Sequence, residues 1–345
     1  MSLDKHLVRR LERSTALSLD PQNSTDKDAP TTAHDIEILM NSLKQVQTAL
    51  AELKEAVITA NIDDKGESMI NFAKPAELFE EFISHSEPVP EKAVPTGLIA
   101  LDKILDGFYP GRLYAIGGRP GMGKTSLMLQ LALNIARNPE NKQPVYIFSF
   151  EMSAGMIAKR LASLAAGAPG KFAFERKLSE FQINALAAGA EALSDLDINI
   201  CDDIDISAKD ICDFCRTLKS GVIFIDYIQL LQYEYKPLIG KEACEWEMDY
   251  VLRHLKDASE KSGIPIIILS QVARSVEEQE NRRPQLMDLL YASDFYFSGV
   301  IMLYRDSYYN SQADDTAELI VERNIGKSGT ARVKWEQARC AFTEK

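Results

Sequence analysis

The stretch IGGRPGMGKTSLML, residues 116–129, decides the fold class. It contains GRPGMGKT, which fits the phosphate-binding pattern GxxxxGK[ST], between an apolar run at residues 113–117 and a helical stripe of Leu and Met. Glycines in this pattern let backbone amides turn toward the β- and γ-phosphates, Lys124 adds a positive charge, and the hydroxyl of Thr125 is placed to hold Mg²⁺. The sequence therefore predicts an ATP and Mg²⁺ site. The residues predicted to contact the nucleotide are Gly118, Arg119, Pro120, Gly121, Met122, Gly123, Lys124, Thr125 and Ser126.

Further apolar runs follow the same pattern along the chain, at residues 145–150, 222–225, 264–269 and 300–303. Short continuous runs of this kind are typical of strands that a parallel sheet buries on both faces. Amphipathic stretches separate several of them. The pattern predicts an α/β fold with a mostly parallel, helix-flanked sheet over residues 94–345.

Polar residues stand where three of these runs end. Asp226 closes the second, Glu151 follows the first, and Ser270 with Gln271 follows the third. In open α/β sheets such strand ends face the ligand, and hydrolysis needs a metal-side carboxylate, a group that orients water and stabilising charge. We interpret Asp226 as a metal ligand beside Thr125, Glu151 as the base and Gln271 as a γ-phosphate sensor. The alternatives are a strand cap for Asp226, a surface residue for Glu151 and a satisfied loop amide for Gln271.

The N-terminal part of the chain has a different composition. Residues 1–32 are polar and are predicted to form a mostly disordered arm after a short basic helix. Residues 33–65 carry an apolar heptad seam, which indicates a coiled-coil-like helix that needs a partner helix. That partner is a second copy, a replication protein or the chain's own globular domain. Residues 66–93 are predicted to hold a linker helix and an extended linker.

Length, charge and cysteine usage limit the class of protein. The 345 residues carry a net charge of −12, which argues against a generally basic surface for DNA or anionic lipid, so any nucleic-acid contact must be local. We find no signal peptide and no membrane span, and we expect a cytoplasmic protein. Among the five cysteines, Cys212 and Cys215 form a CxxC without a second pair, which favours packing over metal binding.

Taken together, these motifs resemble the motor domain of DnaB-type replicative DNA helicases, in a shortened or divergent form as in phages and mobile elements. The resemblance covers residues 94–336 and implies a RecA-like ATPase that forms a hexameric ring, binds ATP at subunit interfaces and moves along single-stranded DNA. By position it implies the same roles for Lys124, Thr125, Glu151, Asp226 and Gln271. The stretches that carry it, besides the phosphate loop, are TGLIALDKIL (96–105), FSFEM (148–152), IDYIQLL (225–231), LSQVAR (269–274) and YRD (304–306).

The chain departs from that family in the stretch VERNIGKSGT, residues 321–330. The family sends an arginine, preceded two positions earlier by a lysine, from this strand into the neighbouring subunit's site. Arg323 is the best available finger here, although an ungapped count places Asn324 at that position, and Lys327 is a possible substitute. The alternative for Arg323 is an ordinary solvated charge.

A second departure is DLLYASDFYFSGVIML, residues 288–303, which replaces the family's acidic stretch beside its DNA-binding loop. The aromatic residues there could stack on bases, but core packing or a subunit contact is favoured. The nearby arginines are candidates for DNA backbone contact, with surface ion pairs as the alternative. The aromatic residues are Tyr291, Phe295, Tyr296 and Phe297, and the arginines are Arg274, Arg282 and Arg283.

The third departure is that residues 1–65 do not show the family's helical N-terminal domain, whereas the apolar helix near residues 78–83 resembles its linker helix. These departures leave open a second function, that of a RecA-like loader or assembly factor which hydrolyses ATP without unwinding DNA. A recombinase-like filament former is less favoured, because FSFEM and IDYIQLL point to the helicase branch.

Overall fold

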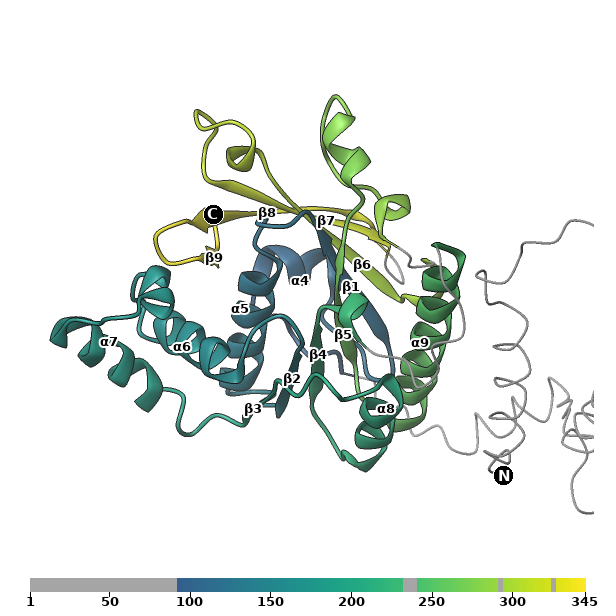
Figure 1. Cartoon of the computed structure of the whole chain (residues 1–345), viewed down its shortest axis with the longest axis horizontal. Coiled ribbons are helices and arrows are strands. Elements are labelled where there is room, and N and C mark those ends of the chain that lie inside the picture. Colours follow the sequence, from purple (N-terminus) through teal and green to yellow (C-terminus); the bar gives the residue numbers. More distant parts are fainter. Residues whose placement is uncertain (1–91, 232–240, 291–293, 324–326) are drawn as a thin grey trace, which may run out of the picture. The chain divides into compact units, whose positions relative to one another are not determined.

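The structure, a computed structural model, describes residues 92–231, 241–290, 294–323 and 327–345 (Figure 1). The predictions for residues 1–91, which include the arm and the coiled-coil-like helix, lie outside the described residues. So do Tyr291 and Asn324. In the part of the chain that is described, no helix is both long and apolar enough to cross a membrane.

The core of the described part is a nine-stranded sheet with the order β3-β2-β4-β5-β1-β6-β7-β8-β9. The strands from β3 to β6 in this order run parallel, and β7, β8 and β9 continue the sheet antiparallel. All five predicted apolar runs are strands, and the mostly parallel sheet is confirmed. The strands are β1 (Leu113–Gly118), β2 (Val145–Ser149), β3 (Ile198–Cys201), β4 (Val222–Asp226), β5 (Ile266–Gln271), β6 (Gly299–Arg305), β7 (Thr316–Arg323), β8 (Gly329–Glu336) and β9 (Ala341–Thr343).

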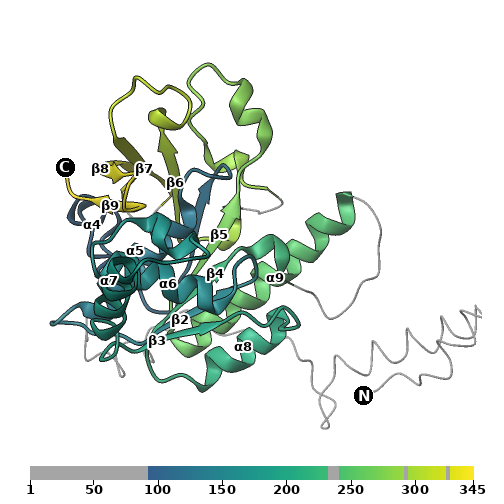
Figure 2. The ribbon, with the colours of Figure 1, turned by 60° about the vertical axis from the view of Figure 1, so that its left-hand side comes forward.

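Helices cover both faces of the sheet, as Figures 1 and 2 show. Alternate residues of one strand enter opposite hydrophobic clusters: in β5, Ile267 packs with α5 whereas Ile268 packs with α8 and α9. This follows from the two-residue period of a strand and explains why the central runs are apolar throughout. The helices are α4 (Ile99–Leu105), α5 (Lys124–Arg137), α6 (Ala154–Ala165), α7 (Glu180–Glu191), α8 (Ala208–Thr217) and α9 (Lys241–Ser262), with short 3₁₀ turns between them that include η1 (Gly170–Phe174).

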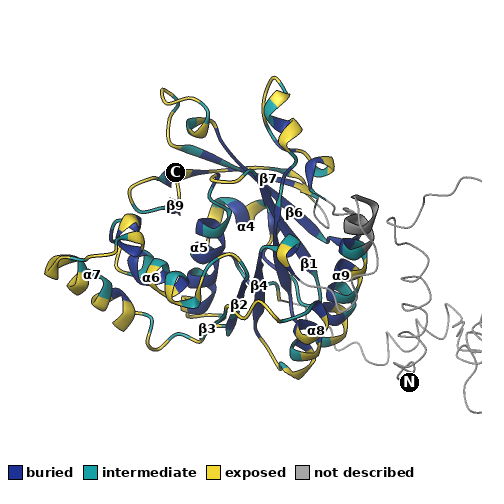
Figure 3. Ribbon diagram, viewed as in Figure 1, coloured by how far each residue is buried: buried dark blue, intermediate teal, exposed yellow. Residues whose placement is uncertain are grey.

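Burial separates the central strands from the late ones (Figure 3). Every residue of β1, β4 and β6 is buried, whereas β8 alternates between buried and exposed residues. The antiparallel extension therefore has one packed face and one more open face, which is common for antiparallel strands.

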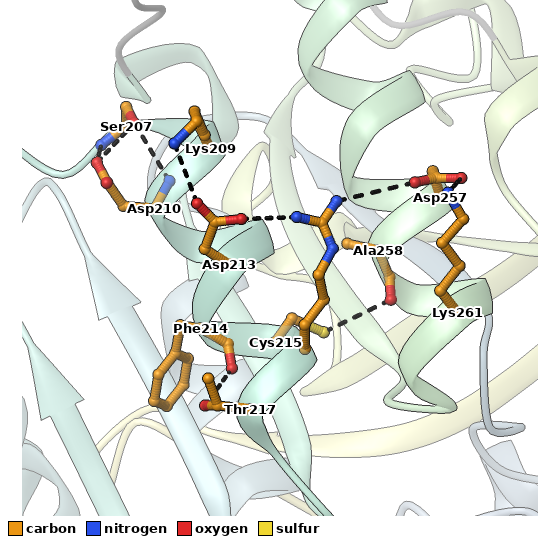
Figure 4. Close-up of polar contacts among 11 residues, drawn as sticks. Ser207, Lys209, Asp210, Asp213, Phe214, Cys215, Thr217, Asp257, Ala258 and Lys261 are labelled. Carbon is orange, nitrogen blue, oxygen red and sulfur yellow. Dashed lines mark hydrogen bonds and ion pairs between the residues drawn. The ribbon is translucent and has the colours of Figure 1, made fainter. Parts of the chain in front are cut away.

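The two cysteines of the CxxC lie on α8 and are both buried in the cluster that α8 forms with α9. Figure 4 shows Cys215 beside Ala258 of α9. The thiol of Cys215 lies 3.1 Å from the hydroxyl of Ser262 on that helix. Arg216, also on α8, makes ion pairs to Asp213 (2.6 Å) and to Asp257 of α9 (4.0 Å). The packing role of the CxxC is confirmed, and the described residues hold no cluster of three metal-ligating side chains.

Candidate active site

The polar residues predicted from strand ends meet at one edge of the sheet. The phosphate loop leaves β1, Glu151 follows β2, Asp226 is the last residue of β4 and Gln271 the last of β5. Because these strands are parallel and adjacent, their carboxyl ends lie together, and Gly118 is the cross-strand partner of Gln271. The arrangement is a nucleotide-binding edge of the kind found in open α/β sheets.

Thr125 and Asp226 are in direct contact across this edge. The hydroxyl of Thr125 donates a 2.8 Å hydrogen bond to the carboxylate of Asp226, which is 1% exposed. Burial raises the pKa of Asp226 to about 6, although the Thr125 hydroxyl lowers it, and the negative charge of Glu151 raises it further. A hydroxyl and a carboxylate side by side are hard oxygen donors, which suits Mg²⁺.

Lys124 lies over the loop at the start of α5. Its ammonium donates to the carbonyl of Gly118 at 2.7 Å and, at a longer 3.4 Å, to that of Arg119. Burial lowers the pKa of Lys124 to about 8, against the opposing charges of Asp226 and Glu151, which raise it. A desolvated ammonium without an ion-pair partner at hydrogen-bond distance among the described residues would gain much from a phosphate.

The backbone of the loop depends on glycine at two positions. Gly121 has φ 75° and Gly123 has φ 109°, both in the left-handed region that other residues avoid. A Cβ at Gly123 would also lie 3.3 Å from the ring of Phe342. Gly123 is the N-cap of α5, so the loop turns directly into a helix whose first amides point out of its N-terminus toward an anion.

Glu151 is exposed at the rim of the site, as a residue that orients water would be. Arg160, on the following α6, was missed by sequence reasoning. Its guanidinium donates to the hydroxyl of Ser126 at 2.7 Å and contacts the sulfur of Met152 at 3.3 Å. Burial lowers the pKa of Arg160, while the charges of Cys340, Asp226 and Glu151 raise it. The one feature of the sequence that could have indicated Arg160 is its position on the amphipathic helix after FSFEM.

Gln271 lies beside a second glutamine that the sequence reading did not single out. The amide of Gln229, within IDYIQLL, donates to the hydroxyl of Ser270 at 2.8 Å and to the carbonyl of Leu290 at 3.2 Å. The amide of Leu290 in turn donates to the carbonyl of Gln271 at 3.0 Å. Gln229 therefore links β5 to the segment that leads into residues 291–293.

The candidate DNA-binding arginines have different surroundings. The side chain of Arg274 is 88% exposed, and the guanidinium of Arg282 lies over the ring of Tyr309 at 4.9 Å. Arg283 makes two hydrogen bonds to Glu318, at 2.7 and 3.2 Å. Arg274 also lies 4.0 Å from the carboxylate of Glu277. The ion-pair alternative therefore describes both Arg283 and Arg274, and DNA contact by these residues stays a prediction.

The aromatic stretch is divided between core and surface. Tyr296 and Phe297 are buried, and the Tyr296 hydroxyl donates to Asp249 of α9 at 2.6 Å. Phe295 is 68% exposed, with the ammonium of Lys256 over its ring at 5.0 Å. The core interpretation is confirmed for Tyr296 and Phe297.

Arg323 and the phosphate loop lie at opposite ends of the strands. Arg323 is the last residue of β7, and it pairs with Val300 near the start of β6. Since β6 runs parallel to β1, its start lies at the edge where β1 begins, whereas the loop follows the end of β1. Lys327, which is exposed, comes after the same strand end. Neither residue is placed to complete the site of its own chain.

The fold and the site together define a P-loop ATPase of the RecA-like class. Two solved structures agree on the fold: an isolated ATPase domain (TM-score 0.69, 24% identity, 80% of this chain and 100% of that one) and a DnaB-like replicative helicase described with its primase interactions (TM-score 0.68, 24% identity, 99% and 78%). Residues 93–344 match the DnaB-like helicase C-terminal domain. The chain belongs to the DnaB-like helicase family, and so to the nucleotide-using helicases.

Curated relatives agree with this assignment. The replicative DNA helicase DnaB of Geobacillus stearothermophilus is 29% identical over 96% of this chain and 70% of its own length. The replicative DNA helicase DnaC of Bacillus subtilis is 28% identical over 96% and 71%. The DnaB of Rickettsia bellii is 34% identical over 65% of this chain and 47% of its own length. The resemblance noted from the motifs is confirmed.

Proposed function

We propose that this chain is an ATP-driven, ring-forming DNA helicase of DNA replication, which hydrolyses Mg·ATP at subunit interfaces to move along single-stranded DNA. The observation that carries the proposal is that the candidate site residues are divided between the two ends of the parallel strands. Lys124, Thr125, Glu151 and Asp226 lie at one end and Arg323 at the other. Two chains packed head to tail, with the strand ends of one against the strand starts of the next, would join these residues, and repetition of that contact forms a ring when the rotation between neighbours closes.

The residues at the first end have separate tasks in hydrolysis. The loop amides and Lys124 hold the β- and γ-phosphates, and Thr125 and Asp226 would hold Mg²⁺ between them. When bound, the metal offsets the charge that develops on the phosphate oxygens. Glu151 orients the attacking water, and Gln271 responds to the γ-phosphate. Arg323 of a neighbouring chain supplies positive charge in the transition state.

The surface of the domain supports assembly with a neighbour. Large apolar side chains are exposed on η1 and α7, and basic residues lie within η1 and in the segment between η1 and α7. The stretch PAELFEEFI, residues 75–83, combines apolar residues at helical spacing with three glutamates. Its apolar residues match the exposed apolar side chains, and its glutamates match the basic ones. We propose that it docks there on an adjacent subunit. The exposed residues are Phe174, Phe181 and Ile183, and the basic ones are Lys171, Arg176 and Lys177.

Contact with DNA is supported locally rather than by the overall charge. Arg119 connects the phosphate loop to the segment after β5, because it donates to the carbonyl of Val272 (2.8 Å) and to Glu277 (3.0 Å). The exposed Arg274 lies on that segment. A DNA phosphate bound there would be one short segment away from the nucleotide.

The test is ATP hydrolysis and strand displacement by the full chain on forked DNA, with Lys124→Ala as the inactive control. We expect single-stranded DNA to stimulate hydrolysis and Lys124→Ala to abolish both activities. Hydrolysis without strand displacement and without a response to single strands would contradict the helicase proposal and favour a loader or assembly factor.

A further inference from the structure

A buried arginine contacts the phosphate loop, and none of the sequence motifs assigns it a role. Arg305 is the last residue of β6 and is 7% exposed. Its Nε donates to the carbonyl of Met122 at 2.8 Å, and its Nη2 donates to the carbonyl of Gly121 at 2.9 Å. Two consecutive carbonyls of the loop are therefore held by one guanidinium group.

An aromatic ring covers one face of the guanidinium group. The group lies over the indole of Trp335 at 4.3 Å from the ring centroid, and Trp335 also packs beneath Gly123. Among the described residues, no ion pair joins Arg305 to a carboxylate. Burial lowers the pKa of Arg305, yet an arginine stays protonated in a protein. The buried cation is therefore received by two carbonyl dipoles and an aromatic face, with the thiol of Cys340 and the phenol of Tyr308 as further neighbours that raise its pKa. Burial of a cation without a carboxylate partner costs free energy that these contacts must offset.

The planarity of the peptide bond gives these contacts a consequence for the nucleotide. In a trans peptide the C=O and the following N–H point in opposite directions. A carbonyl of Met122 held down toward Arg305 therefore turns the N–H of Gly123 up, away from the guanidinium. The carbonyl of Gly121 has its own counterpart in the N–H of Met122, which donates to the carbonyl of Arg119 at 3.1 Å and closes the turn. A charged donor on the carbonyl also polarises the peptide, so its N–H becomes a stronger donor.

We propose that Arg305 is a positioning residue for nucleotide binding, which holds the loop peptides in the orientation that presents the Gly123 amide to phosphate. It acts through the loop and touches no substrate atom. Its position at the end of β6 also connects the loop to a strand that begins at Gly299, two residues after the buried Phe297.

The test measures ADP affinity of the full chain by fluorescence with a labelled ADP, in variants Arg305→Met and Arg305→Lys. Arg305→Met keeps an unbranched stem without donors, and we expect at least a ten-fold loss of ADP affinity. Arg305→Lys keeps the charge and one donor group, and we expect it to recover part of that loss. Amide hydrogen exchange at Gly123 should quicken in Arg305→Met.

The matched control is Val333→Ala on β8, a buried side chain without a contact to the loop carbonyls. It should lower the melting temperature and leave ADP affinity within two-fold. The proposal would be overturned if Arg305→Met bound ADP as tightly as wild type. It would also be overturned if Arg305→Met and Val333→Ala, with equal melting temperatures, lost the same ADP affinity. If Arg305→Met fails to fold, Arg305→Lys decides alone: a folded Arg305→Lys with unchanged affinity and exchange overturns it. The proposal rests on the ATP site of the proposed function, but ADP binding does not depend on DNA or unwinding, so the two can fail separately.

Discussion

The hydroxyl of Thr125 and the carboxylate of Asp226 lie 2.8 Å apart although they are far apart in sequence. Thr125 lies in the first turn of α5, directly after the phosphate loop, and Asp226 is the last residue of β4. Strand β5 lies between β4 and β1 in the sheet. The contact places the two residues that we propose as magnesium ligands beside the phosphate loop, and it makes the proposed metal role testable apart from nucleotide binding.

Asp226→Asn should reduce Mg²⁺-dependent ATP hydrolysis by about 100-fold or more, because it removes a negative oxygen donor near the metal. ADP binding in EDTA should change little, since the loop amides and Lys124 are intact. Asp203→Asn, on the exposed loop after β3, is the control and should hydrolyse ATP at the wild-type rate. Equal Mg²⁺ dependence of Asp226→Asn and wild type would exclude the metal role.

Nucleotide binding in EDTA should weaken as the pH rises above 8. Burial lowers the pKa of Lys124 to about 8, so the ligand-free protein loses this proton near pH 8. The bound phosphate favours the protonated lysine and raises its pKa, so binding above pH 8 takes up a proton and affinity falls with pH. Calorimetry in buffers of different ionisation enthalpy measures that uptake. A Lys124→Met variant should bind weakly and lack the pH dependence, and proton uptake that persists in it would contradict the assignment.

Arg323→Ala should lower ATP turnover by on the order of 10³ with ADP affinity nearly unchanged, because a residue from a neighbouring chain acts mainly in the transition state. Mixtures of Arg323→Ala and Lys124→Ala chains should regain part of the activity, since some interfaces then combine an intact Lys124 with an intact Arg323. Lys327→Ala is the comparison. If it alone loses turnover, the finger is Lys327, and a mixture without any recovery would argue against a shared site.

Deletion of residues 1–65 should change the oligomer size or the capture of partner proteins without disturbing ADP affinity. The heptad seam at residues 33–65 is too narrow to be satisfied without another helix, whereas the ATP site lies in residues 94–345. Native mass measurement on both proteins checks this. The same ring with and without the segment would reject self-association through the seam.

The parallel part of the sheet could be predicted because its strands are buried on both faces and read as continuous apolar runs. The late strands β7 and β8 alternate in burial, and β3 has only four residues at the sheet edge, so none of them forms such a run. Glu151, Asp226 and Gln271 could be proposed as site residues for the same reason, because each stands at the end of a recognisable run. Gln229 and Arg160 lie within a 3₁₀ turn and a helix, where an ordinary polar residue leaves the same pattern.

By itself, the sequence determined that a nucleotide is bound and that the sheet is mostly parallel, because a phosphate loop and a buried strand are both local patterns. The tertiary structure decided what each arginine does. Arg283 is paired with Glu318, Arg305 supports the phosphate loop and Arg323 lies at the far end of the strands. A guanidinium acquires its role from the groups that surround it, and here those groups come from distant parts of the chain, brought together only by the order of the strands.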